Sequence, residues 1–180
     1  LKPIFVNNYK WLKKLNYIKF LREIGKHFTV NKMLSFESVK SRLEREQSLS
    51  YMEFNYMILQ AYDFLELNKS KNCIMQVGGS DQWGNIVNGV ELIKRYSSKQ
   101  VFGLTTPLIT LASGSKMGKT EKGAVWLDKK LLSAYDYWQF WRNIDDRDVL
   151  RFLQMFTDLS LKKIEELKNK NINQLKIILA

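Results

Sequence analysis

The sequence predicts an α/β fold in which one half of a parallel sheet lies between two groups of helices. Residues 1–72 favour helices, because apolar residues recur at helical spacing and polar residues stand where helices would begin. The short apolar run 73–77 indicates a buried strand, and a helical pattern over 83–96 and strand-like runs within 101–111 follow it. From residue 133 onwards the pattern is helical again. This order of elements is typical of an α/β layer with helical flanks.

Capping residues mark the helices of the first group. Asn16 and Ser35 are each placed to cap a helix. Ser50 is followed three residues later by Glu53 and then by an apolar run, which is the capping-box pattern. We therefore expect a helix over about residues 51–67.

The second group of helices follows a segment, 112–123, that is rich in glycine, serine and lysine, where we expect a loop. Ser133, with Asp136 three residues on, would cap the first of these helices. The helices expected here cover 133–143, 146–156 and 161–170.

The composition indicates a globular protein, since the 180 residues are 45% hydrophobic and 13% aromatic. No apolar run is long enough to cross a bilayer, so we expect no membrane partner. Cys73 is the only cysteine and His27 the only histidine, which excludes an intramolecular disulfide and argues against a structural metal site. The net charge of +11 favours a nucleic-acid partner. The alternative is compositional drift in a chain rich in Lys, Asn and Ile.

A glycine pair follows the predicted strand at 73–77. Gly78 and Gly79 have no Cβ, so the backbone there can come close to a ligand. Asp81 and Gln82 follow at the carboxyl end of the strand, where open α/β sheets bind ligands. An acidic side chain in this place can accept hydrogen bonds from both hydroxyls of a ribose. The alternative is that Asp81 caps the next helix.

The expected loop contains two lysines three residues apart, Lys116 and Lys119, among small residues. The segment is similar to a phosphate-binding P-loop, but three residues separate Gly114 from Gly118 where that motif has four. The short spacing therefore disfavours a P-loop NTPase, and we expect a mobile loop that closes on a polyphosphate. A solvated surface loop is the alternative.

The helix expected over 51–67 has three polar residues, Tyr56, Gln60 and Asp63, on one face. A phenol, an amide and a carboxylate in a row can line a polar pocket, and an exposed face is the alternative. Most neighbouring positions of this helix are apolar. A carboxylate in such surroundings needs a partner or a ligand, which favours the pocket.

These features lie in strings that resemble bacterial-type tyrosyl-tRNA synthetases. The strings are YMILQAYDF, QVGGSDQWGNI, VFGLTTPLIT and SGSKMGKTEKGAVWLD, preceded by NNY, FLREIGKHF and SVKSRL. The resemblance covers almost the whole chain in the right order and is loose only over 160–180. It implies the second half of a Rossmann-like class I synthetase catalytic domain. Residues 1–72 would be a helical insertion with the tyrosine-pocket helix, 73–123 the second Rossmann half with the lysine loop, and 124–180 a helical segment leading towards an anticodon-binding domain.

The resemblance also implies a role for each residue of the tyrosine site. Tyr56 and Gln60 would hold the α-amino group of the substrate tyrosine. Asp63 would accept a hydrogen bond from its phenolic hydroxyl, and Gln82 would face its carboxylate.

The ATP site would be formed by two further groups of residues. The Gly79 backbone and Asp81 would bind the ATP ribose. Lys116, Lys119 and Thr120 would form a mobile catalytic loop, which reads Lys-Met-Gly-Lys-Thr here. These residues would neutralise the charge that develops on the departing pyrophosphate.

The implied activity is the ATP-dependent attachment of L-tyrosine to tRNA(Tyr) through tyrosyl-adenylate. ATP with Mg²⁺ would be a substrate, and no tightly bound cofactor or protein-bound metal is expected. The implied compartment is the cytoplasm, with an organelle matrix as the alternative. A homodimer is implied, and apolar candidates for its interface are Phe5, Trp11, Phe20 and Leu21.

The resemblance is incomplete at one motif, because no His-Ile-Gly-His-type ATP sequence occurs in the chain. We therefore expect residues 1–180 alone to be inactive in tyrosine activation. Two alternatives to the tyrosine enzyme stay open from the residues. One is a tryptophanyl-tRNA synthetase, and the other is a non-catalytic RNA-binding or splicing factor built on a synthetase fold.

Overall fold

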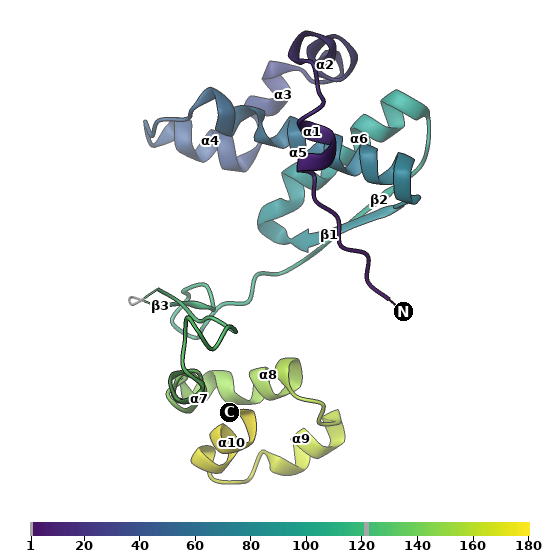
Figure 1. Cartoon of the computed structure of the whole chain (residues 1–180). Helices are drawn as coiled ribbons and strands as arrows, with labels where there is room; N and C mark the ends of the chain where they lie inside the picture. The colour runs from purple at the N-terminus through teal and green to yellow at the C-terminus, as the bar shows by residue number, and fades with distance from the viewer. Residues whose placement is uncertain (1, 121–122) are drawn as a thin grey trace. The chain divides into compact units, whose positions relative to one another are not determined.

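The computed structural model describes residues 2–120 and 123–180. The chain divides into two compact units, Leu1–Leu108 and Ile109–Ala180, each with a hydrophobic core of its own. In Figure 1 the first unit runs from purple to teal and the second from green to yellow. The sequence analysis divided the chain at residues 72 and 123 according to the expected functions of the three regions, and not according to compact units. That division stays a prediction.

The helix α5 (Tyr51–Lys71) is the longest of the first unit and begins at the predicted capping box. The Ser50 hydroxyl accepts a hydrogen bond from the backbone N–H of Glu53, and the Glu53 carboxylate accepts one from the Ser50 N–H at 2.9 Å. The helix ends where Asn72 adopts a left-handed conformation with φ of 53°. The helix predicted over 51–67 is confirmed, and it extends to Lys71.

The helix α6 (Trp83–Ser97) packs along α5 and confirms the helical pattern predicted over 83–96. Gly89 makes this close approach possible, because a Cβ there would lie 2.9 Å from Cδ1 of Phe64. Phe64 is one of the most deeply buried side chains of the unit, with 2% of its surface exposed. These two helices supply most of the core of the first unit, which also includes Ile24, Met33 and Val39 from the segment before α5.

Two parallel strands, β1 (Met75–Gly79) and β2 (Phe102–Thr106), form the sheet of the first unit (Figure 1). Their register runs from Met75 opposite Phe102 to Gly79 opposite Thr106. The strand β1 begins two residues later than the predicted run 73–77 and includes the glycine pair. Because the strands are parallel, the α6 connection between them forms a β-α-β unit.

The two faces of this sheet have different environments. On one face α6 lies so close that a Cβ at Gly103 would be 2.5 Å from Cγ2 of Ile86. On the opposite face, apolar side chains are exposed within the unit. They are Met75, Val77, Phe102 and Leu104.

Short helices precede α5, and only part of their pattern matches the sequence prediction. Asn16 caps a helix as expected, by accepting a hydrogen bond from the Lys19 N–H. The prediction that Ser35 caps a helix is wrong, because its hydroxyl donates to the Lys32 carbonyl at the end of a short helix and the next helix begins after Phe36. The elements are α1 (Tyr9–Leu12), α2 (Tyr17–Glu23), η1 (Gly25–His27), α3 (Val30–Leu34) and α4 (Glu37–Glu44).

The second unit is mainly helical, around a core that contains Trp141, Phe152 and Leu153. Ser133 caps its first helix as predicted, by accepting a hydrogen bond from the Asp136 N–H. The last helix, α10, has no counterpart among the predicted elements. The helices are α7 (Ala134–Arg142), α8 (Asp146–Phe156), α9 (Leu161–Leu167) and α10 (Ile172–Leu179).

The predicted α/β class is confirmed by a parallel strand pair with helices before, between and after its strands. Among residues 2–120 and 123–180, no helix is both long enough and apolar enough to span a membrane.

Candidate functional site

The glycine turn joins β1 to α6 through a short 3-10 helix, η2 (Ser80–Gln82). A Cβ at Gly79 would lie 2.8 Å from Oδ1 of Asp81 and 2.8 Å from Cδ2 of Leu108, so no larger residue fits without displacing one of them. Asp81 itself is exposed. Its predicted alternative role as a helix cap is wrong, because α6 has Gln82 at its N-cap position and neither η2 nor α6 has a capping side chain.

Gln82 lies half-buried at the end of the turn. Its Oε1 accepts a hydrogen bond from Nδ2 of Asn85 at 3.3 Å. A Cβ at Gly78 would be 3.1 Å from Cβ of Gln82, so the glycine lets this side chain fold against the end of the strand. The turn therefore presents a carboxylate and an amide at the carboxyl end of β1, as the sequence predicts.

The Asp63 carboxylate on the polar face of α5 has a defined orientation, because two side chains from the start of the chain donate hydrogen bonds to it. Trp11 Nε1 donates to Oδ1 of Asp63 at 2.7 Å, and Asn8 Nδ2 donates to Oδ2 at 2.9 Å. A carboxylate has about four acceptor positions, so Asp63 keeps capacity for another donor. Tyr56 is 60% exposed and Gln60 half-buried on the same helix. The helix therefore presents a phenol, an amide and an anchored carboxylate.

A hollow of about 340 Å³ lies beside the Asp63 carboxylate. Asn8 and Trp11 line this hollow together with Asp63. The sequence analysis placed neither of them at the tyrosine site and named Trp11 only as a candidate for a dimer interface. They are 55 and 52 residues away from Asp63 in the chain, so no local spacing connects them. The sequence offers only an indirect signal for them. A carboxylate on a mostly apolar helix needs hydrogen-bond donors, and the segment before residue 16 contains side chains that can donate.

The lysine segment forms a hairpin within the second unit. Its turns at 112–115 and 117–118 agree with the loop expected over 112–123, which is wrong only where Lys116 pairs with Thr110 and where short strands form at 119–120 and 123–124. Residues 121–122 of that expectation lie outside the described residues. Thr110 pairs with Lys116 in an antiparallel bridge. The Leu111 N–H donates to the Ser115 carbonyl at 2.8 Å. Lys116 therefore has a defined position opposite Thr110 in this hairpin.

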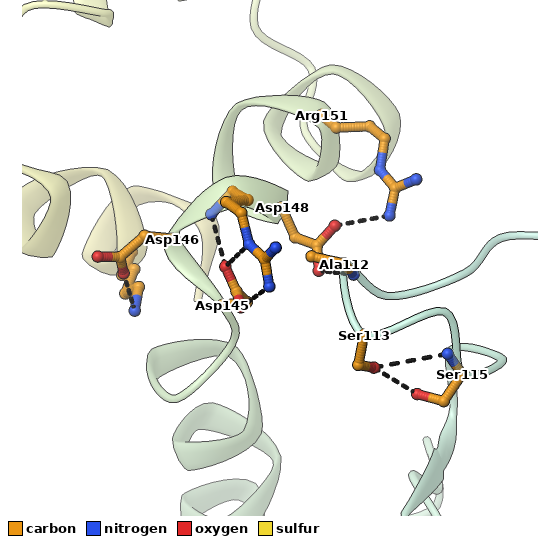
Figure 2. Close-up of polar contacts among 9 residues, drawn as sticks. Ala112, Ser113, Ser115, Asp145, Asp146, Asp148 and Arg151 are labelled. Atoms are coloured by element: carbon orange, nitrogen blue, oxygen red, sulfur yellow. Dashed lines mark hydrogen bonds and ion pairs between the residues drawn. The ribbon is translucent and has the colours of Figure 1, made fainter.

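A tight turn closes this hairpin. The Gly114 N–H donates to the Leu111 carbonyl at 2.8 Å, and Gly114 has φ of 83°, which favours glycine. The hydroxyls of Ser113 and Ser115 lie 2.8 Å apart across the turn (Figure 2).

The hairpin is attached to the core of the second unit by alternate residues. Ile109, Leu111 and Met117 are partly buried and pack against that core. Lys116 precedes Met117 and is exposed. Because successive side chains of a strand alternate between faces, the apolar anchors direct the lysine outward.

The second lysine lies where the hairpin continues into β3 (Lys119–Thr120), which pairs antiparallel with β4 (Gly123–Ala124). In a P-loop the Gly-Lys-Thr sequence opens a helix, so the strand at Lys119–Thr120 is a further observation against a P-loop. The side chains of Lys119 and Thr120 lie outside the described part of the chain. Asp63, Asp81 and Gln82 belong to the first unit and Lys116 to the second, so their joint binding of one adenylate stays a prediction.

Comparison with known proteins decides the family. The family described as "tRNA synthetases class I (W and Y)" matches residues 2–180. The chain belongs to this family. The α/β fold and the resemblance predicted from the sequence are thereby confirmed.

Relatives of this synthetase chain include curated proteins of bacteria. It is 79% identical over 179 residues to the tyrosine–tRNA ligase of Pelagibacter ubique, covering 99% of this chain and 44% of the relative. It is 62% identical over 180 residues to that of a Wolbachia pipientis strain, covering 98% of this chain and 43% of the relative. The chain thus spans less than half the length of these relatives.

Solved structures of the same family share the fold of this synthetase chain. The truncated mitochondrial tyrosyl-tRNA synthetase of Aspergillus nidulans matches with a TM-score of 0.78 and 33% identity, over 95% of this chain and 49% of that one. The tryptophanyl-tRNA synthetase of Campylobacter jejuni matches with a TM-score of 0.56 and 14% identity, over 90% of this chain and 56% of that one. The latter likeness concerns the fold alone.

Proposed function

We propose that this chain forms part of the catalytic domain of an enzyme that attaches tyrosine to tRNA(Tyr) with ATP. The observation that supports this most is the anchored carboxylate of Asp63, which receives donors from Asn8 and Trp11 and borders a hollow. A carboxylate held in this way can bind the phenolic hydroxyl of tyrosine and would lose that partner with phenylalanine. Tyrosine-activating enzymes are the reference case for this kind of discrimination.

The activation step requires positioning more than covalent chemistry. A carboxylate oxygen of tyrosine attacks the α-phosphorus of Mg²⁺–ATP, and the bond from that phosphorus to the bridging oxygen of pyrophosphate breaks. Gln82 faces the attacking carboxylate, while Asp81 and the Gly79 backbone hold the ribose. The missing Cβ of Gly79 lets the Asp81 carboxylate lie close to the backbone at the carboxyl end of β1, which supports their joint role at the ribose.

The lysine hairpin acts on the leaving group. Lys116, Lys119 and Thr120 stabilise the negative charge that accumulates on pyrophosphate as the bond breaks. The activated tyrosine then passes to the 3′ end of tRNA(Tyr). The net charge of +11 supports a polyanionic partner of this kind.

The assembly proposed for the complete enzyme is a homodimer in the cytoplasm. Of the four apolar candidates for an interface, Phe5 is 92% and Leu21 38% exposed. The other two have partners within the unit: Phe20 packs edge-on against Tyr62, and the indole of Trp11 bonds to a carboxylate. Phe5 and Leu21 are therefore the better candidates.

The test is a chimeric enzyme in which this chain replaces the matching 179 residues of the Pelagibacter ubique relative. We expect the chimeric enzyme to catalyse tyrosine-dependent ATP–pyrophosphate exchange and to charge tRNA(Tyr), and the 180-residue chain alone to show negligible exchange. A folded chimeric enzyme that activates no tyrosine, or that prefers tryptophan, would contradict the proposal. RNA binding without any activation would instead favour a non-catalytic RNA-binding protein.

A further inference from the structure

The helix α8 contains a carboxylate that is almost completely buried. Asp148 is 2% exposed, so its charge requires partners. Both of its oxygens have one: Oδ2 accepts from the Ala112 N–H at 2.7 Å, and Oδ1 accepts from Nη2 of Arg151 at 2.7 Å (Figure 2). The first of these partners belongs to the lysine hairpin, 36 residues earlier in the chain.

Arg151 forms a second connection to the same hairpin. Its Nη2 donates to the Thr110 carbonyl. Asp148 and Arg151 therefore hold the first strand of the hairpin at two alternate residues, Thr110 and Ala112. Thr110 in turn pairs with Lys116 on the second strand. The hydrogen bonds of this pair join the flanking residues, from the Leu111 N–H to the Ser115 carbonyl and from the Met117 N–H to the Ile109 carbonyl. The contacts of α8 therefore reach the lysine through the backbone pairing of the hairpin.

A hollow of about 610 Å³ lies next to these contacts. Leu111 and Ser113 of the hairpin and Phe140 of α7 line it together with Asp148. The hairpin is therefore fixed to α8 at one side and borders open space at another. Without the polar contacts, its first strand has room to move.

We propose that Asp148 is a positioning residue, which with Arg151 fixes the lysine hairpin so that Lys116 meets the leaving pyrophosphate. This inference rests on the proposed function. The contacts are directional hydrogen bonds to an amide and a guanidinium, which set an orientation as well as a distance. Apolar packing by Ile109, Leu111 and Met117 keeps the hairpin on the core, and Asp148 defines where its first strand lies.

The first test is Asp148→Asn in the chimeric enzyme. An asparagine offers one acceptor oxygen and one NH₂ donor, so in either orientation a donor faces the Ala112 N–H or Arg151. Because small misplacements of catalytic groups are costly, we expect kcat of ATP–pyrophosphate exchange to fall on the order of tenfold or more. The KM for tyrosine should stay within about twofold, since a change confined to the hairpin affects the leaving group rather than tyrosine binding. The matched control is Asp145→Asn, which makes the same chemical change at an exposed carboxylate that bonds to Arg147. The asparagine still has one side-chain oxygen to accept the capping hydrogen bond from the Arg147 N–H.

The decisive comparison is a double-mutant cycle with Lys116→Ala. If Asp148 acts through Lys116, Asp148→Asn should have little further effect on kcat once the lysine is absent. Arg151→Gln, on an exposed side chain, gives a second variant that loses the contact to Thr110 while the buried carboxylate remains.

Amide hydrogen exchange gives a readout that does not depend on activity. Exchange at Leu111 and Ala112 should become faster in Asp148→Asn and in Arg151→Gln, and should stay unchanged in Asp145→Asn. An unchanged kcat, a fully additive cycle, or a loss of tyrosine affinity equal to the loss of kcat would overturn the positioning role. These results are distinct from failure of the proposed function, which would appear as an inactive unsubstituted chimeric enzyme.

Discussion

Trp11→Phe removes one of the two hydrogen bonds that orient the tyrosine-selecting carboxylate. The substitution keeps an aromatic ring and deletes the Nε1–H donor that lies 2.7 Å from Oδ1 of Asp63. A hydrogen bond to a charged group contributes about 1.5–3 kcal/mol. Asp63 is only half-buried, so the lower limit of about 1.5 kcal/mol applies, which corresponds to roughly a tenfold change in an equilibrium constant.

The effect should appear in tyrosine recognition, because the freed carboxylate no longer has one orientation towards the phenolic hydroxyl. In the chimeric enzyme we expect the KM for tyrosine in ATP–pyrophosphate exchange to rise about tenfold. The preference for tyrosine over phenylalanine, measured as the ratio of kcat/KM values, should fall by about the same factor.

Trp126→Phe is the matched control, because it makes the same chemical change at a half-exposed tryptophan of the second unit. A Trp11→Phe enzyme whose KM for tyrosine stays within about twofold of the parent would refute the role given to this hydrogen bond. An equal change in Trp126→Phe would refute it too, since the effect would then not depend on Asp63.

Three further outcomes follow from the contacts. Gly103→Ala should lower the free energy of unfolding by about 1–3 kcal/mol, because its Cβ would lie 2.5 Å from Ile86 Cγ2, and urea unfolding measures this loss. Hydrogen bonds from Ser50 lower the pKa of Glu53 from 4.5 to about 2, so stability present above pH 4.5 should decline as the pH falls towards 2, and Glu53→Gln should show a smaller decline in urea titrations at each pH. Lys116→Ala should lower kcat of ATP–pyrophosphate exchange about a hundredfold, and an unchanged kcat would remove this lysine from the mechanism.

The elements that the sequence predicted best are those set by local chemistry. The capping box at Ser50 and Glu53 places the start of α5 correctly, because both hydrogen bonds form within three residues. The same holds for the cap at Asn16. Ser35 had the residue type of a cap, yet its hydroxyl bonds backwards to a carbonyl, a choice that residue type alone does not determine.

The contacts that the sequence did not predict depend on tertiary packing. Trp11 and Asn8 reach Asp63 from more than 50 residues away, and Asp148 meets Ala112 from the next group of helices. The lysine hairpin was expected as a loop, because its glycines and serines give no alternating pattern. Its pairing follows from the burial of alternate residues against the core of the second unit.

A crystal structure of the chimeric enzyme with a non-hydrolysable sulfamoyl analogue of tyrosyl-adenylate would show whether Asp63, Asp81 and Lys116 bind one adenylate. We expect the phenolic hydroxyl of the analogue to lie within hydrogen-bond distance of Asp63 and its ribose within that distance of Asp81. Lys116 should lie on the side where pyrophosphate leaves. An analogue bound elsewhere, or one whose phenol is held by residues other than Asp63, would show that these residues do not form the tyrosyl-adenylate site.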